Sequence, residues 1–223
     1  VMFMAAGFCM LEAGLVRTTS VSTICVKNLT LYAIAGIMYY LVGYNLMYSG
    51  VDGGYIGQFA LWVQDESANI ADGSFIGEGG YSAASDWFFQ MVFVATAASI
   101  VSGTVAERVK LWPFLMFTAV LTAFIYPVVA SWEWGGGALD SQFAFSDFAG
   151  STLVHSTGGW AALVGAIIIG PRAGKFVNGT VHPMPGSNIP LAALGTFILW
   201  FGWFGLTAPR SLLPARSMTS MPS

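Results

Sequence analysis

The charged residues of this chain are few, and they lie in short segments between long uncharged stretches. Its 223 residues include eight lysines and arginines and eleven aspartates and glutamates. A transmembrane helix needs roughly 20 mainly apolar residues. Five stretches without a charged side chain approach that length: 28–48, 87–105, 111–130, 150–170 and 189–206. Together with the apolar start at residues 1–16, they predict an all-α, polytopic transmembrane helical bundle with about six crossings.

The sign of the charge alternates from one connection to the next. The basic residues form three pairs, Arg17 with Lys27, Arg108 with Lys110 and Arg172 with Lys175. The acidic residues between these pairs are Asp52, Asp65, Glu66, Asp72, Glu78, Asp86, Glu133, Asp140 and Asp147. Because loops rich in lysine and arginine tend to stay in the cytoplasm, we expect cytoplasmic basic loops and an external acidic loop at 50–86. Arg210 and Arg216, near the end of the chain, break this alternation.

The composition argues against several classes of function. Charged residues make up 9% of the chain, against about 25% in soluble domains, so lipid is the expected solvent. There is no basic patch for nucleic-acid phosphates. Motifs of soluble catalysis or nucleotide binding are missing, and Cys9 and Cys25 lack the spacing of metal ligands. We therefore expect no enzymatic activity, no metal, no cofactor and no nucleic-acid partner.

One histidine stands inside an apolar stretch. His155 follows Asp147 by about 12 Å along a helix that rises 1.5 Å per residue. Ionisable groups inside a membrane commonly line a cavity, a proton route or a substrate path. The alternative is a neutral histidine that is hydrogen-bonded to a neighbouring helix. His182, in a loop that contains proline and glycine, is expected to be solvated.

Asp147 and several aromatic residues gather at the acidic end of the predicted bundle. Asp147 precedes a helical stretch, so it is either a helix cap or a buried carboxylate that attracts cations, and both roles are compatible. The aromatic residues near this end are Trp87, Phe88, Phe89, Phe93, Trp132 and Trp134. They form either an aromatic belt at the membrane interface or a cage that binds a small cation by cation–π attraction.

Four segments carry a resemblance to a known family. They are 10–17 (MLEAGLVR), 89–110 (FQMVFVATAASIVSGTVAERVK), 147–170 (DFAGSTLVHSTGGWAALVGAIIIG) and 194–205 (LGTFILWFGWFG). These segments resemble the ammonium transporters of the Amt/MEP/Rh family. The resemblance implies that residues 1–206 form the first half of an eleven-helix inverted-repeat transporter fold, with a clipped first helix. Residues 207–223 depart from the family pattern, and we expect a shifted reading frame or an artificial end there.

The resemblance also implies roles for individual residues. Trp134 and Phe93 match an external ammonium recruitment site, and Phe93 also matches a phenyl gate of the pore. Asp147 matches the aspartate that holds this site, His155 the first of two pore histidines and Trp203 a residue that lines the pore. The second gate and a serine of the external site fall at Leu206 and Arg210, where this sequence departs from the family.

The implied function is transport of ammonium across the cell membrane. Ammonium would be recruited outside, deprotonated and passed as ammonia through an apolar pore. The resemblance further implies a homotrimer and a possible PII-type signalling partner on the cytoplasmic face. An alternative is an ammonium-sensing input module of a signalling protein, and a third interpretation is a purely structural membrane bundle. Because the second histidine belongs to the other half, we expect these 223 residues alone not to restore methylammonium uptake.

Overall fold

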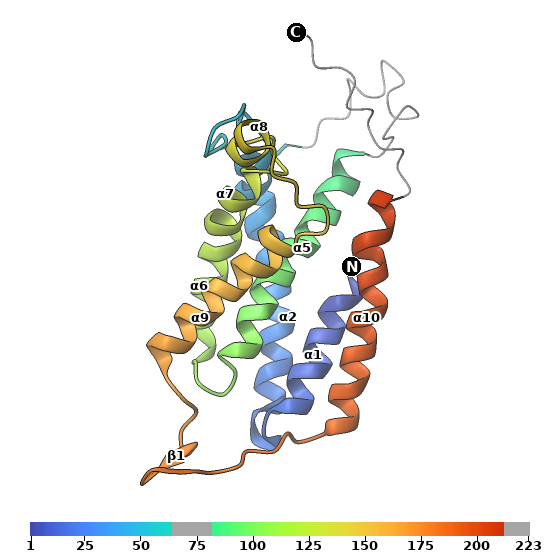
Figure 1. Ribbon diagram of the computed structural model, residues 1–223. Coiled ribbons are helices and arrows are strands. Elements are labelled where there is room, and N and C mark those ends of the chain that lie inside the picture. Colours follow the sequence, from blue (N-terminus) through green and yellow to red (C-terminus); the bar gives the residue numbers. More distant parts are fainter. Residues whose placement is uncertain (64–81, 212–223) are drawn as a thin grey trace.

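Figure 1 shows the computed structural model of the chain, which describes residues 1–63 and 82–211. The first part contains α1 (Phe3–Leu15), η1 (Thr18–Ser20), α2 (Val21–Met38), η2 (Tyr39–Gly43) and α3 (Tyr44–Tyr48). The second part begins with α5 (Ala83–Thr104), α6 (Leu111–Val120), η4 (Leu121–Ile125), α7 (Tyr126–Ser131) and α8 (Ala138–Phe143). It continues with η5 (Ser151–Ser156), α9 (Thr157–Ile169), the hairpin strands β1 (Phe176–Val177) and β2 (Thr180–Val181), and α10 (Ile189–Ser211).

The helices match the predicted membrane spans. Among the described residues, four helical stretches are long and apolar enough to cross a membrane: Thr18–Tyr48, Ala83–Thr104, Leu111–Ser131 and Ser151–Ile169. Two shorter apolar helices cover Phe3–Leu15 and Ile189–Gly205, at the other two predicted positions. The prediction of an all-α transmembrane bundle is confirmed. The backbone of α10 stays helical to Ser211, whereas residues 212–223 and the side chains of Leu206 and Arg210 lie outside the described part.

Glycines allow the helices to approach closely. A Cβ atom at Gly195 of α10 would lie 2.4 Å from the main-chain nitrogen of Leu11 in α1. In the same way, a Cβ atom at Gly14 of α1 would lie 2.5 Å from the main-chain nitrogen of Ala192 in α10. A Cβ atom at Gly158 of α9 would lie 2.9 Å from the carbonyl oxygen of Ala97 in α5. Small residues permit this backbone contact in membranes, so α1 pairs with α10 and α5 pairs with α9 (Figure 1).

Three described spans contain a π-helical turn, namely η2, η4 and η5. Pro127 lies just after η4; a proline removes one main-chain hydrogen bond and crowds the preceding turn, which the wider π turn accommodates. A Cβ atom at Gly43 of η2 would lie 3.1 Å from the carbonyl oxygen of Thr122 in η4. The two distorted turns therefore pack against each other through a glycine.

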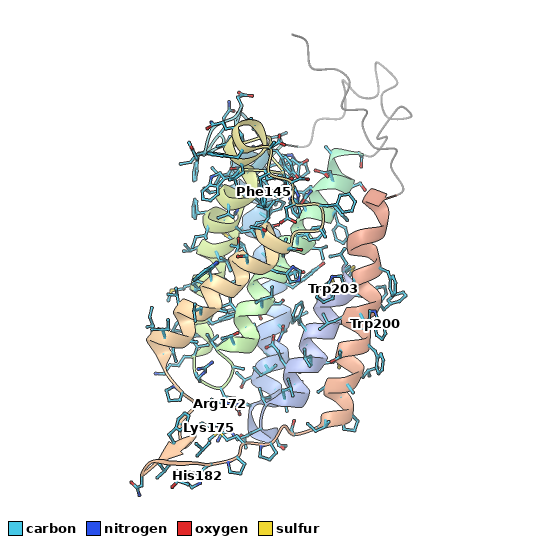
Figure 2. The ribbon with its side chains drawn as sticks, in the orientation of Figure 1. Phe145, Arg172, Lys175, His182, Trp200 and Trp203 are labelled. Carbon is cyan, nitrogen blue, oxygen red and sulfur yellow. The ribbon has the colours of Figure 1, made fainter. Side chains whose placement is uncertain are left out.

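Charge separates the two ends of the bundle. Arg172, Lys175 and the exposed His182 lie at the end with the β hairpin, and Phe145 lies at the opposite end near α8, whose first turn contains Asp140 (Figure 2). We name these the basic end and the acidic end. The prediction that Lys27 belongs to a basic loop is wrong, because Lys27 lies within α2 and is only 3% exposed. Asp65, Glu66, Asp72, Glu78 and Arg216 are outside the described residues.

Candidate functional site

Phe93 and Trp134 come together at the acidic end. Phe93 is a buried residue of α5, and Trp134 follows the end of α7. Their ring centroids are 5.5 Å apart with an angle of 67° between the planes, and Phe89 meets Phe93 in a similar edge-to-face contact at 4.9 Å. This arrangement is the favourable geometry for aromatic pairs. The two residues expected in one recruitment site are thus direct neighbours.

Asp147 fixes the orientation of the Trp134 ring through its main chain. The indole Nε1–H of Trp134 donates a hydrogen bond to the carbonyl oxygen of Asp147 at 2.6 Å. The main-chain N–H of Asp147 donates to Oε1 of Glu133 at 3.0 Å. Because both ends of this peptide segment are tied to the residues that follow α7, the indole plane is held in one orientation beside Phe93.

The carboxylate of Asp147 caps the start of η5. Its Oδ1 accepts hydrogen bonds from the main-chain N–H groups of Gly150 at 2.8 Å and Ser151 at 3.0 Å. Its Oδ2 accepts from Thr152 at 2.7 Å and Leu153 at 2.8 Å. A carboxylate offers about four acceptor sites, and all are used here. The capping interpretation is therefore correct.

Gly150 is required where the chain turns from Asp147 into η5. Its φ of +82° lies in the left-handed region that disfavours side chains. A Cβ atom there would also lie 3.0 Å from Cη2 of Trp134 and 2.6 Å from Cγ2 of Val154. Because Gly150 has no side chain, the Trp134 ring and Val154 of η5 can pack directly against the main chain of the capping segment.

His155 projects from η5 toward α10. Its Nδ1 lies 3.2 Å from the carbonyl oxygen of Gly150, and its ring stacks on Trp203 with centroids 5.4 Å apart. Figure 2 shows Trp203 on the side of α10 that faces the bundle. Because a carbonyl only accepts hydrogen bonds, a hydrogen bond at this contact would use the tautomer that carries its hydrogen on Nδ1. A neutral ring then keeps the Nε2 lone pair as its acceptor.

The sequence interpretation missed a buried polar network toward the basic end. Oε2 of Glu12 accepts hydrogen bonds from Ser102 Oγ at 2.7 Å and Asn28 Nδ2 at 3.2 Å, and it lies 3.7 Å from Lys27 Nζ. Lys27 Nζ also donates to the carbonyl oxygen of Ser102 at 2.8 Å and lies over the Phe114 ring. The available signal was Glu12 itself, an ionisable residue within an apolar helix.

A second cluster of ion pairs lies at the basic end. The carboxylate of Glu107, in the turn between α5 and α6, lies 2.9 Å from Nε of Arg17 and 2.7 Å from a terminal nitrogen of Arg172. Burial alone would raise the pKa of Glu107. Hydrogen bonds from Arg172 and Arg17 outweigh burial and lower that pKa from 4.5 to about 2. Glu107 thereby joins three connections that are far apart in the sequence.

Comparison with known proteins identifies the family. The chain matches the family description "Ammonium Transporter Family" over residues 1–215. It is 41% identical to ammonium transporter Amt2 of Archaeoglobus fulgidus over 222 residues, which is 95% of this chain and 45% of that protein. It is 42% identical to Amt1 of Haloferax mediterranei over 214 residues, 92% of this chain and 40% of that protein.

Solved structures agree with this match. A protein described as "Sensor Amt Protein" superimposes with a TM-score of 0.79 at 37% identity and covers 92% of this chain and 50% of its own. The N240A mutant of Candida albicans Mep2 superimposes with a TM-score of 0.75 at 26% identity, over 92% of this chain and 44% of its own. The chain thus spans about half the length of the relatives that it matches. As an apolar helical member of this family, it lies in the membrane. It belongs to the ammonium transporter family.

Proposed function

We propose that this chain provides the ammonium recruitment site and part of the conduction path of a membrane ammonium transporter. The observation that carries the proposal is the connected arrangement of Phe93, Trp134 and Asp147, followed along η5 by His155 and its contact with Trp203. The proposal takes its substrate from the relatives, which are named ammonium transporters.

Recruitment uses the aromatic rings and the nearby negative charge. The face of a tryptophan attracts a small cation with about 0.5–2 kcal/mol, depending on desolvation. Trp134 presents such a ring, Phe93 supports it from the side, and the hydrogen bond to Asp147 fixes its plane. The Asp147 carboxylate, saturated by four N–H groups, adds negative potential without ligating the ion.

Conduction beyond this point favours the neutral molecule. Moving a full charge into an apolar segment costs several kcal/mol or more, and ammonium can avoid that cost by losing a proton, which potassium cannot do. In the tautomer that carries its hydrogen on Nδ1, which lies 3.2 Å from the Gly150 carbonyl oxygen, His155 would offer the Nε2 lone pair to the N–H groups of the passing molecule. Trp203, stacked on the imidazole, keeps the ring in place.

An ammonium-sensing input module is the second candidate function. The observation that favours it is the similarity to the solved protein described as a sensor. The same recruitment site would serve both functions, since sensing needs binding without net flux. The homotrimer and the PII-type partner stay predictions from the family resemblance.

A chimera tests the proposed function. Residues 1–205 replace the matching half of Archaeoglobus fulgidus Amt2, the chimera is expressed in transporter-deficient cells, and methylammonium uptake is measured. Transport predicts uptake well above that of cells with an empty vector. Binding of methylammonium by the purified chimera without uptake would instead support sensing. Correct membrane insertion without either binding or uptake would refute both functions.

A further inference from the structure

An apolar groove of about 670 Å³ runs along the bundle between α6, η4 and α7 on one side and η5 and α9 on the other. Buried valines of α5 lie behind it. The lining side chains are apolar except for three hydroxyl residues in η5 and the first turn of α9. Three lining residues of α9, Trp160, Val164 and Ile168, are more than half exposed. The groove is therefore open along the side of α9.

The groove follows most of a membrane span. Its lining residues on η5 and α9 begin at Thr152 and end at Ile169, which corresponds to about 26 Å at a rise of 1.5 Å per residue. The hydrocarbon core of a bilayer is about 30 Å thick, or about 15 Å for one leaflet. The groove thus opens to lipid and is long enough for an extended acyl chain.

Two segments with lysines meet the groove at its basic end. Val109, in the turn between α5 and α6, and Ile169, at the end of α9, both line the groove. Lys110 follows Val109 directly, and Lys175 lies six residues after Ile169. The apolar groove therefore ends where the chain becomes cationic.

Two contacts hold these segments together. A terminal nitrogen of Arg108 donates a hydrogen bond to the carbonyl oxygen of Gly170 at 2.7 Å. A terminal nitrogen of Arg172 lies 2.7 Å from Oε2 of Glu107. Because Arg108 lies two residues before one lysine and Arg172 three residues before the other, these contacts bring both lysines to the same end of the groove.

The charge of the two lysines is not neutralised nearby. Neither Lys110 nor Lys175 forms an ion pair within the described residues. The one acidic residue in segments 103–115 and 170–190 is Glu107, and two arginines already pair with it. The basic end of the groove therefore attracts anions.

The β hairpin fixes the main chain at Lys175. Its N–H donates a hydrogen bond to the carbonyl oxygen of Arg172 at 3.0 Å, and its carbonyl oxygen accepts one from His182 at 2.9 Å. The cross-strand partners Phe176 and Val181 are 59% and 56% exposed, and exposed apolar residues beside cations suit a membrane interface. Figure 1 shows the hairpin beyond the end of α9, about level with the turn between α1 and α2. Lys175 is thus held where lipid headgroups lie.

We propose that this groove binds a phospholipid with an anionic headgroup. One acyl chain lies between α6 and α9, and the headgroup faces Lys110 and Lys175. Basic loops stay in the cytoplasm, and the negative surface of the cytoplasmic leaflet attracts such cations, so the lipid belongs to that leaflet. The proposal does not depend on the proposed function, because it needs neither binding nor movement of ammonium.

Lipid selectivity tests the role of the two lysines. Native mass spectrometry of the full chain in detergent gives the dissociation constant of the first bound lipid, with phosphatidylglycerol and phosphatidylcholine of identical acyl chains as probes. A lysine near the membrane surface strengthens binding of an anionic lipid by about fivefold, so the parent should prefer phosphatidylglycerol by up to about thirtyfold. Lys110→Gln and Lys175→Gln should each lower this preference by about fivefold. Equal affinity of the parent for both lipids would overturn the proposal.

Filling the groove tests where the acyl chain lies. Val164→Trp places a large side chain in the groove, and Leu163→Trp is its matched control, because Leu163 is similarly exposed but does not line the groove. Ile168→Trp and its control Ile167→Trp repeat the comparison nearer the lysines. All four positions are exposed, so the fold should tolerate each change, and thermal unfolding checks this.

The two groove variants should bind both lipids severalfold more weakly than the parent, whereas the two controls should bind as the parent does. If Val164→Trp and Ile168→Trp bound lipid as tightly as their controls, the groove would not be the site.

Two other occupants of the groove give different results. If a second copy of the chain filled it, Val164→Trp would change the ratio of oligomers in the same spectra and leave lipid binding unaltered. If the other half of a relative covered it, Val164→Trp would weaken lipid binding by the 223-residue chain but not by the chimera with Archaeoglobus fulgidus Amt2. Either result would overturn the proposal.

Discussion

Trp134 donates its indole N–H to the main-chain carbonyl of Asp147 at 2.6 Å, and the Asp147 carboxylate in turn accepts four main-chain N–H groups from the start of η5. One residue thus connects the aromatic ring at the acidic end with the helix that carries His155. The orientation of the ring and the position of the imidazole are therefore structurally linked.

Replacing Trp134 by leucine should weaken methylammonium recruitment. Loss of a cation–π contact worth about 0.5–2 kcal/mol corresponds to a rise of about two- to thirtyfold in the half-saturating concentration. The measurement is concentration-dependent uptake by the chimera with Archaeoglobus fulgidus Amt2. Trp160→Leu, on an exposed face of α9, is the matched control and should leave the half-saturating concentration unchanged.

Replacing Asp147 by alanine should destabilise the protein as well as weaken recruitment. The variant leaves four main-chain N–H groups without their acceptor, and loss of a helix cap alone costs about 0.5–2 kcal/mol. Asp147→Asn keeps the shape but offers one acceptor oxygen, so we expect an intermediate loss. Thermal unfolding of the purified protein in detergent gives the order of stability. An Asp147→Ala variant as stable as the parent would exclude the capping role.

Glu107 should make stability depend on pH in the acid range. Its pKa in the folded protein is about 2, below the ordinary value of 4.5, so the folded state favours the ionised form. The contribution is fully present above the unfolded pKa and is lost as the pH falls from about 4.5 toward 2. Thermal unfolding across this range should show a steeper loss for the parent than for Glu107→Gln.

The comparison of slopes isolates Glu107 from the other carboxylates, which titrate in both proteins. Equal slopes for the parent and Glu107→Gln would mean that the contacts of Glu107 with Arg17 and Arg172 contribute nothing to stability in water. The exposed Asp140→Asn is a suitable control, since its carboxylate is not part of this cluster.

The sequence predicted the spans well because charge and hydropathy decide where a chain can cross a lipid bilayer. Long uncharged stretches located α5 and the combined span of η5 and α9 within a few residues. The same rule placed Lys27 wrongly, because counting charges cannot show that Glu12, 15 residues earlier in the chain, lies beside it in the fold. Such a pair depends on how α1 packs on α2, which no local pattern encodes.

The residues of the candidate site were predicted, but their local geometry was not, because that geometry also depends on the fold. The family motifs pointed to Phe93, Trp134, Asp147, His155 and Trp203, and the structure brings them together in two groups, Phe93 with Trp134 and Asp147, and His155 with Trp203. The capping role of Asp147 was predicted, but the π turn of η5 and the number of main-chain N–H groups that the carboxylate accepts were not, because they depend on the left-handed backbone at Gly150.

The most direct test of the proposed mechanism is methylammonium uptake by the chimera with His155→Ala, compared with the unsubstituted chimera at equal amounts in the membrane. If His155 takes part in moving the neutral cargo, uptake should fall severalfold or more while assembly is retained. His182→Ala, in the exposed hairpin region, should have no effect. Unchanged uptake in His155→Ala would contradict the account and favour a structural role for the imidazole.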